Sequence, residues 1–217
     1  MTSFKVVAVI PALNEEETIG KVVAGACAET SRVIVVDDGS QDRTKDIAEK
    51  AGAYVISHDA PRGYGRSLED GLAFAFSSGA DAVVTLDADG QHDSRDIQRL
   101  IGKLMEGFDV VIAERPYRTH MAERIFALYT KLRFGIRDPL CGLKAYRRSV
   151  YEAIGRFDAL DSIGTELVLL AKKMGFTSAV VPIELAKRID TSRFYEKRFR
   201  ANVKIFKAMC KVIVAIR

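Results

Sequence analysis

The sequence predicts an α/β protein built on a mostly parallel β-sheet that is flanked by helices on both faces. Over roughly the first hundred residues, short apolar segments alternate regularly with longer amphipathic segments. The apolar segments are nearly continuous, which is typical of parallel strands buried on both faces. The chain has 217 residues, of which 48% are hydrophobic and 29% charged. These values are ordinary for a globular chain of about one domain.

The predicted strands and helices of this first part alternate in order. The strands are Phe4–Ile10, Val33–Val36, Ala53–Ser57, Ala82–Leu86 and Asp109–Ala113. The helices between them are Glu15–Ala28, Asp42–Ala51, Ser67 to about Ser77 after a glycine-containing loop, and Arg95 to about Met105. Since parallel sheets bind ligands at the carboxyl ends of their strands, the loops after these strands are the expected place for a site.

After Glu114 the pattern becomes less regular. The predicted elements are a basic amphipathic helix at Thr119–Phe134, a loop from Asp138 to Gly142, and three further elements at Leu143–Tyr146 (strand), Thr165–Met174 (helix) and Ser178–Ile183 (strand). No repeat or low-complexity linker separates the two parts. We therefore expect one domain over residues 1–195, with a regular half over 1–114 and a less regular half over 115–195.

Composition and hydropathy exclude several classes of protein. No apolar run approaches the roughly 20 residues of a membrane-spanning helix. The apolar stretch Val6–Leu13 is followed by three glutamates, which makes it a poor signal peptide and a good first strand. The three cysteines, Cys27, Cys141 and Cys210, are widely spaced and odd in number, and they form neither a disulfide framework nor a zinc signature. Reduced thiols in a cytoplasmic protein are expected.

Positive charge is concentrated in the tail. Residues 187–217 carry ten Lys/Arg and two acids, a net +8, so the other 186 residues carry −4 of the total +4. On a helical wheel, residues 196–217 form a basic stripe with a wide apolar arc, which predicts a basic amphipathic C-terminal helix. Such a helix suits the surface of an anionic membrane. The alternative is that its apolar face packs on the domain or on a second subunit.

The stretch from Asp87 to Gln91 carries the strongest chemical signal. It follows a predicted strand and reads Asp-Ala-Asp-Gly-Gln. If the chain stays extended, Asp87, Asp89 and Gln91 share one face, because side chains alternate along a strand. Two carboxylates and an amide oxygen suit a divalent cation such as Mg²⁺. The alternative is a solvated acidic turn.

Two other loops end in polar residues. Asp37 and Asp38 close the second strand and could accept hydrogen bonds from a nucleotide, or they could belong to a helix-capping cluster with Ser40 or Asp42. Asn14, after the first strand, could likewise cap the following helix. That turn has no G-x-G-x-x-G, which argues against an NAD-dependent oxidoreductase.

Three segments together resemble a known family. They are Ile10-Pro-Ala-Leu-Asn-Glu-Glu-Glu17, Val35-Val-Asp-Asp-Gly-Ser-Gln-Asp42 and Leu86-Asp-Ala-Asp-Gly-Gln-His92. In order and position they resemble the nucleotide-sugar half of inverting family 2 glycosyltransferases, which have the GT-A nucleotide-diphospho-sugar transferase fold. The resemblance extends over about residues 4–195 and is closest to the dolichyl-phosphate mannose synthase-like, or polyprenyl-phosphate, glycosyltransferases. Further matches are Gly63-x-Gly65-x5-Gly71, Asp138–Tyr146 and Arg188-x-x-x-Ser192-Arg193.

The resemblance implies roles for particular residues. The nucleotide pocket would be lined by Pro11, Leu13, Asn14, Glu15, Val36 and Asp38, with Asp38 reading the base, and by the stretch Asp87, Ala88 and Asp89. A divalent ion, Mg²⁺ or Mn²⁺, would be held by Asp87, Asp89 and Gln91. The catalytic set would be Asp89, Arg115 near the reacting phosphates, Arg188 on the donor diphosphate or the acceptor phosphate, and Glu166.

Some of these positions leave alternatives open. Glu166 would orient the acceptor or act as a base, or it is an acid favoured at a helix N-terminus. The chain departs from the family pattern at Asp190 and Arg193, where glycine and lysine are usual, and at Thr165, where glutamine is common.

The expected activity is metal-dependent, inverting transfer of a hexose, of mannose or glucose type, from a GDP- or UDP-sugar to a polyprenyl or dolichyl phosphate. A phosphate monoester is already an oxyanion near neutral pH and needs no base. Basic residues outnumber acids between Arg115 and Arg148 and suit the task of neutralising two anionic groups. The protein would act peripherally on the cytoplasmic face of a membrane, with no nucleic acid partner, and could form a homo-oligomer.

Three rival functions remain open at this point. A family 2 enzyme could instead act on a sugar hydroxyl in polysaccharide synthesis. A phosphatase of the haloacid dehalogenase type would use the Asp87-Ala-Asp-Gly segment as its nucleophile loop, although that loop normally follows the first strand and here follows the fourth. A non-enzymatic rival is a membrane-recruited subunit that binds a nucleotide sugar.

Overall fold

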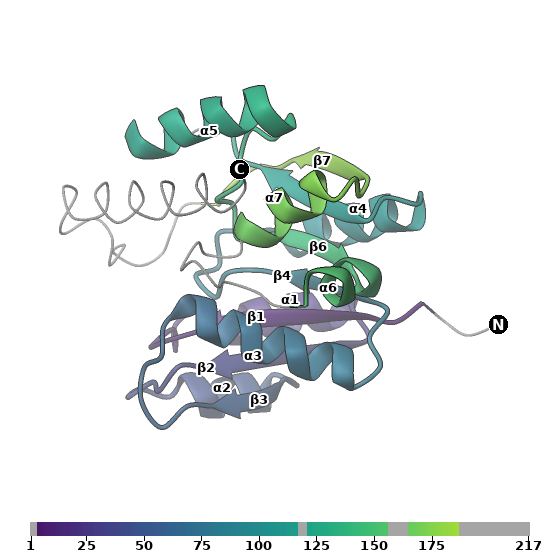
Figure 1. Ribbon diagram of the computed structural model, residues 1–217. Coiled ribbons are helices and arrows are strands. Elements are labelled where there is room, and N and C mark those ends of the chain that lie inside the picture. The colour runs from purple at the N-terminus through teal and green to yellow at the C-terminus, as the bar shows by residue number, and fades with distance from the viewer. Residues whose placement is uncertain (1–3, 117–120, 156–164, 187–217) are drawn as a thin grey trace.

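A seven-stranded sheet forms the centre of the protein (Figure 1). The computed structural model describes residues 4–116, 121–155 and 165–186. The strand order is β3-β2-β1-β4-β6-β5-β7. The strands are β1 (Val6–Ala12), β2 (Arg32–Asp37), β3 (Tyr54–Ser57), β4 (Ala82–Thr85), β5 (Val110–Glu114), β6 (Lys144–Arg147) and β7 (Ser178–Pro182). Strand β6 runs antiparallel to both β4 and β5, and the other pairings are parallel. The predicted mostly parallel sheet is confirmed.

Helices cover both faces of this sheet, as predicted. The helices are α1 (Ile19–Glu29), α2 (Thr44–Lys50), α3 (Tyr64–Ser77), α4 (Ser94–Met105), α5 (Met121–Phe134), α6 (Arg148–Ile154) and α7 (Thr165–Lys173). One hydrophobic cluster joins the sheet to α1, α2 and α4, and a second joins it to α3, α5, α6 and α7 (Figure 1). No helix in the described ranges has the length and hydrophobicity to cross a membrane.

The core explains why the strands read as continuous apolar runs. Every residue of β1 is buried, with Ala8 and Ile10 in the cluster under α1 and α4, and Val7 and Val9 in the cluster under α3. Alternate residues of one strand therefore fill two different cores. On the α3 side the helix lies very close to the sheet, because a Cβ at Gly71 would lie 2.5 Å from Cγ1 of Val9.

The prediction that a helix starts at Glu15 is wrong, since α1 begins at Ile19. Asn14 takes a left-handed backbone conformation, with φ of 47°. The next amides are used outside the helix: that of Glu15 donates to Thr44 Oγ1 at 2.7 Å and that of Glu16 to Asp42 Oδ2 at 3.2 Å. The loop is thus held by α2, and the predicted Asn14 cap does not form.

Other boundaries shift by a few residues. Helix α2 begins at Thr44 instead of Asp42, whose carboxylate accepts the Thr44 amide, and α3 begins at Tyr64 instead of Ser67. Helix α6 was not predicted. The start of the predicted helix at Thr119 and the whole predicted tail helix, 196–217, lie outside the described residues.

Candidate active site

Three loops meet at one edge of the sheet, because β2, β1 and β4 are parallel neighbours. Asn14, after β1, connects the first loop to the second. Its amide donates to Ser40 Oγ at 2.8 Å, and its side-chain oxygen accepts the amide of Gln41 at 2.8 Å. Thr18 connects the first loop to the third, since its hydroxyl donates to the Ala88 carbonyl at 2.7 Å. The three loops are therefore joined by direct hydrogen bonds.

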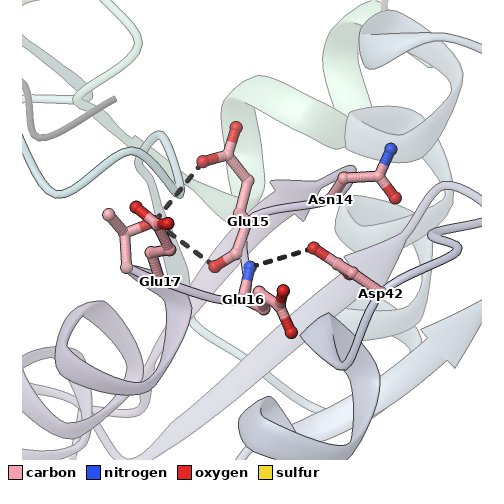
Figure 2. A pocket seen from close by; sticks show the side chains of 6 residues that line it. Asn14, Glu15, Glu16, Glu17 and Asp42 are labelled. Atoms are coloured by element: carbon pink, nitrogen blue, oxygen red, sulfur yellow. Dashed lines mark hydrogen bonds between the residues drawn. The ribbon is translucent and has the colours of Figure 1, made fainter. Parts of the chain in front are cut away.

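A polar pocket opens in the first of these loops (Figure 2). Its lining residues are Asn14, Glu15, Glu16, Glu17, Thr18 and Asp42. Figure 2 shows the Glu16 amide directed at the Asp42 carboxylate. The Thr18 hydroxyl lies 3.3 Å from the backbone carbonyl oxygen of Glu15 and 3.4 Å from its carboxylate. Of the predicted nucleotide residues, Asn14 and Glu15 belong to this pocket.

The other predicted nucleotide residues on β1 and β2 lie beside them. Pro11 and Val36 are partners in the register of β1 and β2, and both are buried. Leu13 follows in the partly exposed segment after β1. These residues form the apolar carboxyl ends of β1 and β2, next to the loops that follow these strands.

Asp38 holds a loop in place. Its carboxylate accepts the amides of Arg62 and Gly63, both at 2.8 Å, and lies 2.7 Å from Nδ1 of His58. The other ring nitrogen of His58 lies 3.1 Å from Asp70. Burial alone would raise the pKa of Asp38, but these hydrogen bonds outweigh it and hold the pKa below its ordinary value.

This arrangement bears on the predicted role of Asp38 in reading a base. A carboxylate has about four lone-pair positions, and three contacts already use the Asp38 oxygens. The base-reading role stays a prediction. The part played by His58 was missed, because a histidine 20 positions away gives no local signal; the one available hint was its place at the end of a predicted strand.

The Asp87–Gln91 segment does not stay extended. The chain turns at Ala88 and Asp89, Gly90 has a φ of 73°, and the amide of Gln91 donates to Asp89 Oδ1 at 3.1 Å. The expectation that alternation places Asp87, Asp89 and Gln91 on one face is therefore wrong, since it required an extended chain. All three belong to one tight turn at the end of β4, and their role as metal ligands stays a prediction from the family.

Three elements surround the carboxylate of Asp87. The Tyr64 hydroxyl, at the start of α3, donates to Oδ1 at 2.9 Å, and Nε2 of His92 lies 3.5 Å from Oδ2. On another side is Gly142, where a Cβ would lie 2.2 Å from Oδ2. Burial raises the pKa of Asp87, but His92, Tyr64 and the nearby charge of Lys144 hold it below its ordinary value. The anionic form is favoured.

His92 has a second notable property. Its Nδ1 is the one buried side-chain nitrogen or oxygen without a hydrogen-bond partner among the described residues. Nearby, Lys144 on β6 is fully buried, and this burial lowers its pKa despite the carboxylates around it. Neither residue's position beside Asp87 was predicted, although His92 directly follows Gln91 and Lys144 lies in the Asp138–Tyr146 match.

Arg115, at the end of β5, pairs with Asp138. Its Nε lies 2.7 Å and its Nη2 2.8 Å from the two carboxylate oxygens, and its amide donates to the same carboxylate at 3.1 Å. Burial alone would lower the pKa of Arg115. The hydrogen bonds to Asp138 and its negative charge together outweigh burial, so the pKa of Arg115 lies above its ordinary value. This pair anchors the loop that brings Gly142 to Asp87.

Glu166, in the first turn of α7, is buried. Its neighbour Thr165 donates to the Pro139 carbonyl at 3.1 Å, which ties α7 to the same loop. Arg188 lies outside the described residues. Two residues before Arg188, the chain contacts the acidic turn after β4, because the amide of Ala186 donates to the Gln91 carbonyl at 3.0 Å.

Comparison with known proteins decides the family. The family model described as glycosyl transferase family 2 matches residues 7–164, a range that contains all three joined loops. The chain belongs to glycosyl transferase family 2. A phosphatase of the haloacid dehalogenase type is thereby ruled out.

Curated relatives of this family 2 glycosyltransferase include enzymes named for polyprenyl-phosphate substrates. A polyprenol monophosphomannose synthase of Mycolicibacterium smegmatis is 30% identical over 205 residues, 83% of this chain and 77% of that protein. An undecaprenyl-phosphate 4-deoxy-4-formamido-L-arabinose transferase of Pseudomonas aeruginosa is 36% identical over 163 residues, 67% of this chain. The match spans about half, 48%, of that transferase. An uncharacterized protein of Methanocaldococcus jannaschii is 33% identical over 196 residues, 81% of this chain and 79% of that protein.

Solved structures confirm the GT-A fold. A glucosyl-3-phosphoglycerate synthase from Mycobacterium tuberculosis, crystallised with Mn²⁺ and UDP-glucose, aligns with a TM-score of 0.74 at 24% identity, over 96% of this chain and 79% of that one. A further mycobacterial protein aligns with a TM-score of 0.76 at 24% identity, over 97% of this chain and 75% of that one. A divalent metal ion is thus part of a solved neighbour of this fold.

The residues at the turn fit a divalent ion. Carboxylate and amide oxygens are the ligand types that Mg²⁺ and Mn²⁺ prefer. The lowered pKa of Asp87 favours its anionic form, and its carboxylate packs directly on Gly142, where an added Cβ would overlap it. In the described part of the chain, no three His, Cys, Asp or Glu side chains gather for a metal. The predicted metal ligands, Asp87, Asp89 and Gln91, differ from such a cluster because they comprise two carboxylates and one amide.

Proposed function

We propose that this glycosyltransferase transfers a hexose, mannose or glucose, from a GDP- or UDP-sugar to a polyprenyl phosphate with inversion, using a divalent metal, at the cytoplasmic surface of a membrane. The observation that carries the proposal is the hydrogen bond from Thr18 to the Ala88 carbonyl, 2.7 Å long, which fixes the acidic turn against the loop with the polar pocket. A nucleotide bound at the first loop would then have its diphosphate at the turn.

The donor would lie across the carboxyl ends of β1 and β2. Pro11 and Val36 would offer an apolar floor, and Leu13, Asn14, Glu15 and Asp38 would contact the nucleoside. The Asn14 bonds to Ser40 and Gln41 support this arrangement, because they hold both loops in one geometry before the donor arrives.

The diphosphate would be bound at Asp87, Ala88 and Asp89, and Asp87, Asp89 and Gln91 would hold the metal ion. A bound Mg²⁺ or Mn²⁺ stabilises the negative charge that develops on a departing diphosphate. The protein's part is to present Asp87 as a fixed anion, which the contacts of Tyr64 and His92 support. We propose that residues 1–114 supply this donor half.

The acceptor would be bound by residues 115–195 of the same domain. A lipid phosphate is already deprotonated near neutral pH, so the protein's task is to bring two anions together. Arg115 would contribute positive charge at the edge of the sheet while Asp138 fixes its orientation. Arg188 would contact phosphate, and Glu166, in the first turn of α7, would orient the acceptor.

The decisive experiment supplies donor, metal and acceptor to the purified chain. GDP-mannose and UDP-glucose are each incubated with undecaprenyl phosphate and Mg²⁺ or Mn²⁺, and the product is tested for a lipid-linked sugar that mild acid releases. We expect product with one donor and loss of product with EDTA. Asp89→Ala should abolish transfer without unfolding the protein. Glu106→Ala, at the far end of α4, is the matched control and should keep full activity.

The other outcomes each contradict the proposal. Transfer to a polysaccharide but not to the lipid phosphate would assign a hydroxyl acceptor. Binding of a nucleotide sugar without turnover would favour a binding subunit. Full turnover by Asp89→Ala in the presence of metal would remove the acidic turn from the reaction.

A further inference from the structure

Helix α5 presents apolar side chains on two opposite sides. Ala122, Phe126, Ala127 and Thr130 are buried against the rest of the protein. Met121, Ile125, Leu128 and Leu132, here named the outer stripe, are between 51% and 79% exposed. The spacing of four, three and four residues places the outer stripe within an arc of about 60°, facing away from the buried side.

The outer stripe is a concentration of exposed apolar surface. Large hydrophobic residues are exposed at eight positions in the described part of the chain, and the outer stripe holds four of them. Scattered exposed hydrophobics are normal, but a continuous row along one helix marks an interaction surface. Figure 1 shows α5 at the margin of the molecule, at the end of the sheet that carries β7.

The charges beside the stripe are mostly positive. Arg124 and Lys131 are exposed and lie along one border of the stripe, and Arg133 is exposed near its end. Glu123 is the single acid within α5. An apolar row bordered by cations fits the interfacial layer of an anionic bilayer, where the apolar side chains enter the acyl boundary and the cations meet the headgroups.

Charge also favours an anionic bilayer over two other partners for the outer stripe, which are the tail of the same chain and a second copy of the chain. Residues 187–217 of the same chain carry ten Lys/Arg and two acids, so even with their apolar arc on α5 they would offer few acids to pair with Arg124 and Lys131. A second copy of the chain would bring the same Arg124 and Lys131 borders to the interface. An anionic lipid surface is the partner that both the stripe and its cations favour.

The ends of α5 lead into the candidate active site. Arg115 precedes the helix by a few residues, and the segment after it contains Asp138 and Gly142, which reach Arg115 and Asp87. The end of the helix is fixed to that segment, since the Thr130 hydroxyl donates to the Ile136 carbonyl at 2.8 Å. A surface bound by the outer stripe is therefore coupled through a short, hydrogen-bonded connection to the predicted acceptor side.

We propose that the outer stripe of α5 docks on an anionic lipid bilayer and presents the active site to a lipid phosphate in that bilayer. This deepens the proposed function, because it rests on a membrane-embedded acceptor. The stripe supplies binding to the surface and takes no part in the chemistry, so a water-soluble acceptor does not need it.

The experiment compares the full-length chain with two double variants on vesicles of phosphatidylcholine and phosphatidylglycerol, 7:3. Ile125→Asp/Leu128→Asp disrupts the outer stripe. Met105→Asp/Met174→Asp is the matched control, because these methionines are 62% and 53% exposed elsewhere on the surface. We expect the stripe variant to lose at least tenfold in vesicle partitioning by co-sedimentation, and the control to stay within twofold of the unchanged protein.

Activity is then measured with two acceptors. With undecaprenyl phosphate in the same vesicles, the stripe variant should lose at least tenfold in rate. With a short, water-soluble prenyl phosphate and no vesicles, it should match the unchanged protein. If the unchanged protein transfers sugar to neither acceptor, the proposed function itself is wrong, whatever the vesicle binding.

Three results would overturn the docking proposal while leaving the function intact. The stripe variant and the control could partition equally onto vesicles. The stripe variant could change the molecular mass in solution with no change on vesicles, which would assign the stripe to a second copy. It could also lose activity toward the soluble acceptor at unchanged melting temperature, which would assign the stripe to the domain's own function.

Discussion

Replacing Gly142 by alanine tests whether the position of the Asp87 carboxylate matters for the reaction. A Cβ at this position would lie 2.2 Å from Oδ2, 2.4 Å from Cγ and 2.4 Å from Oδ1 of Asp87. Since such atoms pack at about 3.5 Å or more, the carboxylate or the loop must move by about 1 Å. The Tyr64 hydrogen bond and the His92 contact oppose this movement.

A displacement of about 1 Å at a reacting centre costs on the order of 100-fold in rate, which corresponds to about 2.7 kcal/mol. We therefore expect Gly142→Ala to lower kcat/KM for sugar transfer by about 100-fold and to weaken Mn²⁺ binding followed by electron paramagnetic resonance. The fold should remain, because the Asp87 side chain is one-third exposed and can rotate outward.

The matched control is Gly102→Ala in the middle of α4, where no atom lies within 4 Å of the added Cβ. This change should leave activity unaltered and stabilise the helix by up to about 1 kcal/mol. Activity of Gly142→Ala within threefold of the unchanged protein, at a native melting temperature and with unaltered Mn²⁺ binding, would refute the placement of Asp87 in the reaction.

Three further predictions concern the framework of the site. Gly71→Ala should destabilise the protein by about 1–3 kcal/mol in urea unfolding, because its Cβ would overlap Val9; an unchanged unfolding midpoint would contradict the close packing of α3. Asp138→Asn should cost about 3–5 kcal/mol, since it leaves the largely buried Arg115 without its counter-charge, and a loss below 1 kcal/mol would show that water replaces the pair. The lowered pKa of Asp38 means that its carboxylate stabilises the folded state above its ordinary pKa and loses this effect as the pH falls through the lowered value. The stability difference between the unchanged protein and Asp38→Asn should accordingly shrink between pH 6 and about pH 3 in thermal unfolding, and a constant difference would contradict the assignment.

Local sequence patterns were sufficient for the sheet and for the loops that carry the site. Strands such as β1 and β2 are buried on both faces, so their apolar runs stand out and their ends were predicted to within about two residues. The acidic turn after β4 was located for the same reason. These features depend on residues close together in the chain.

The parts that sequence reasoning missed depend on distant contacts. The start of α1 moved because the amides of Glu15 and Glu16 bond to Thr44 and Asp42, more than 20 positions away. The Ala88 carbonyl in the acidic turn accepts a hydrogen bond from the hydroxyl of Thr18, 70 positions away. Neither hydrophobic periodicity nor residue propensity indicates contacts between residues so far apart in the chain.

The place of the antiparallel strand β6 in the sheet determines the order in which the strands can pair during synthesis. Strand β4 has β6 as one neighbour, and β6 ends at Arg147. On a ribosome, the first four strands emerge well before that residue, so β4 waits with an open edge that could pair with another nascent chain. The acidic turn would come into contact with Gly142 only when this edge closes. Completion of the candidate active site would then be a late event in biosynthesis, and it would coincide with protection from aggregation.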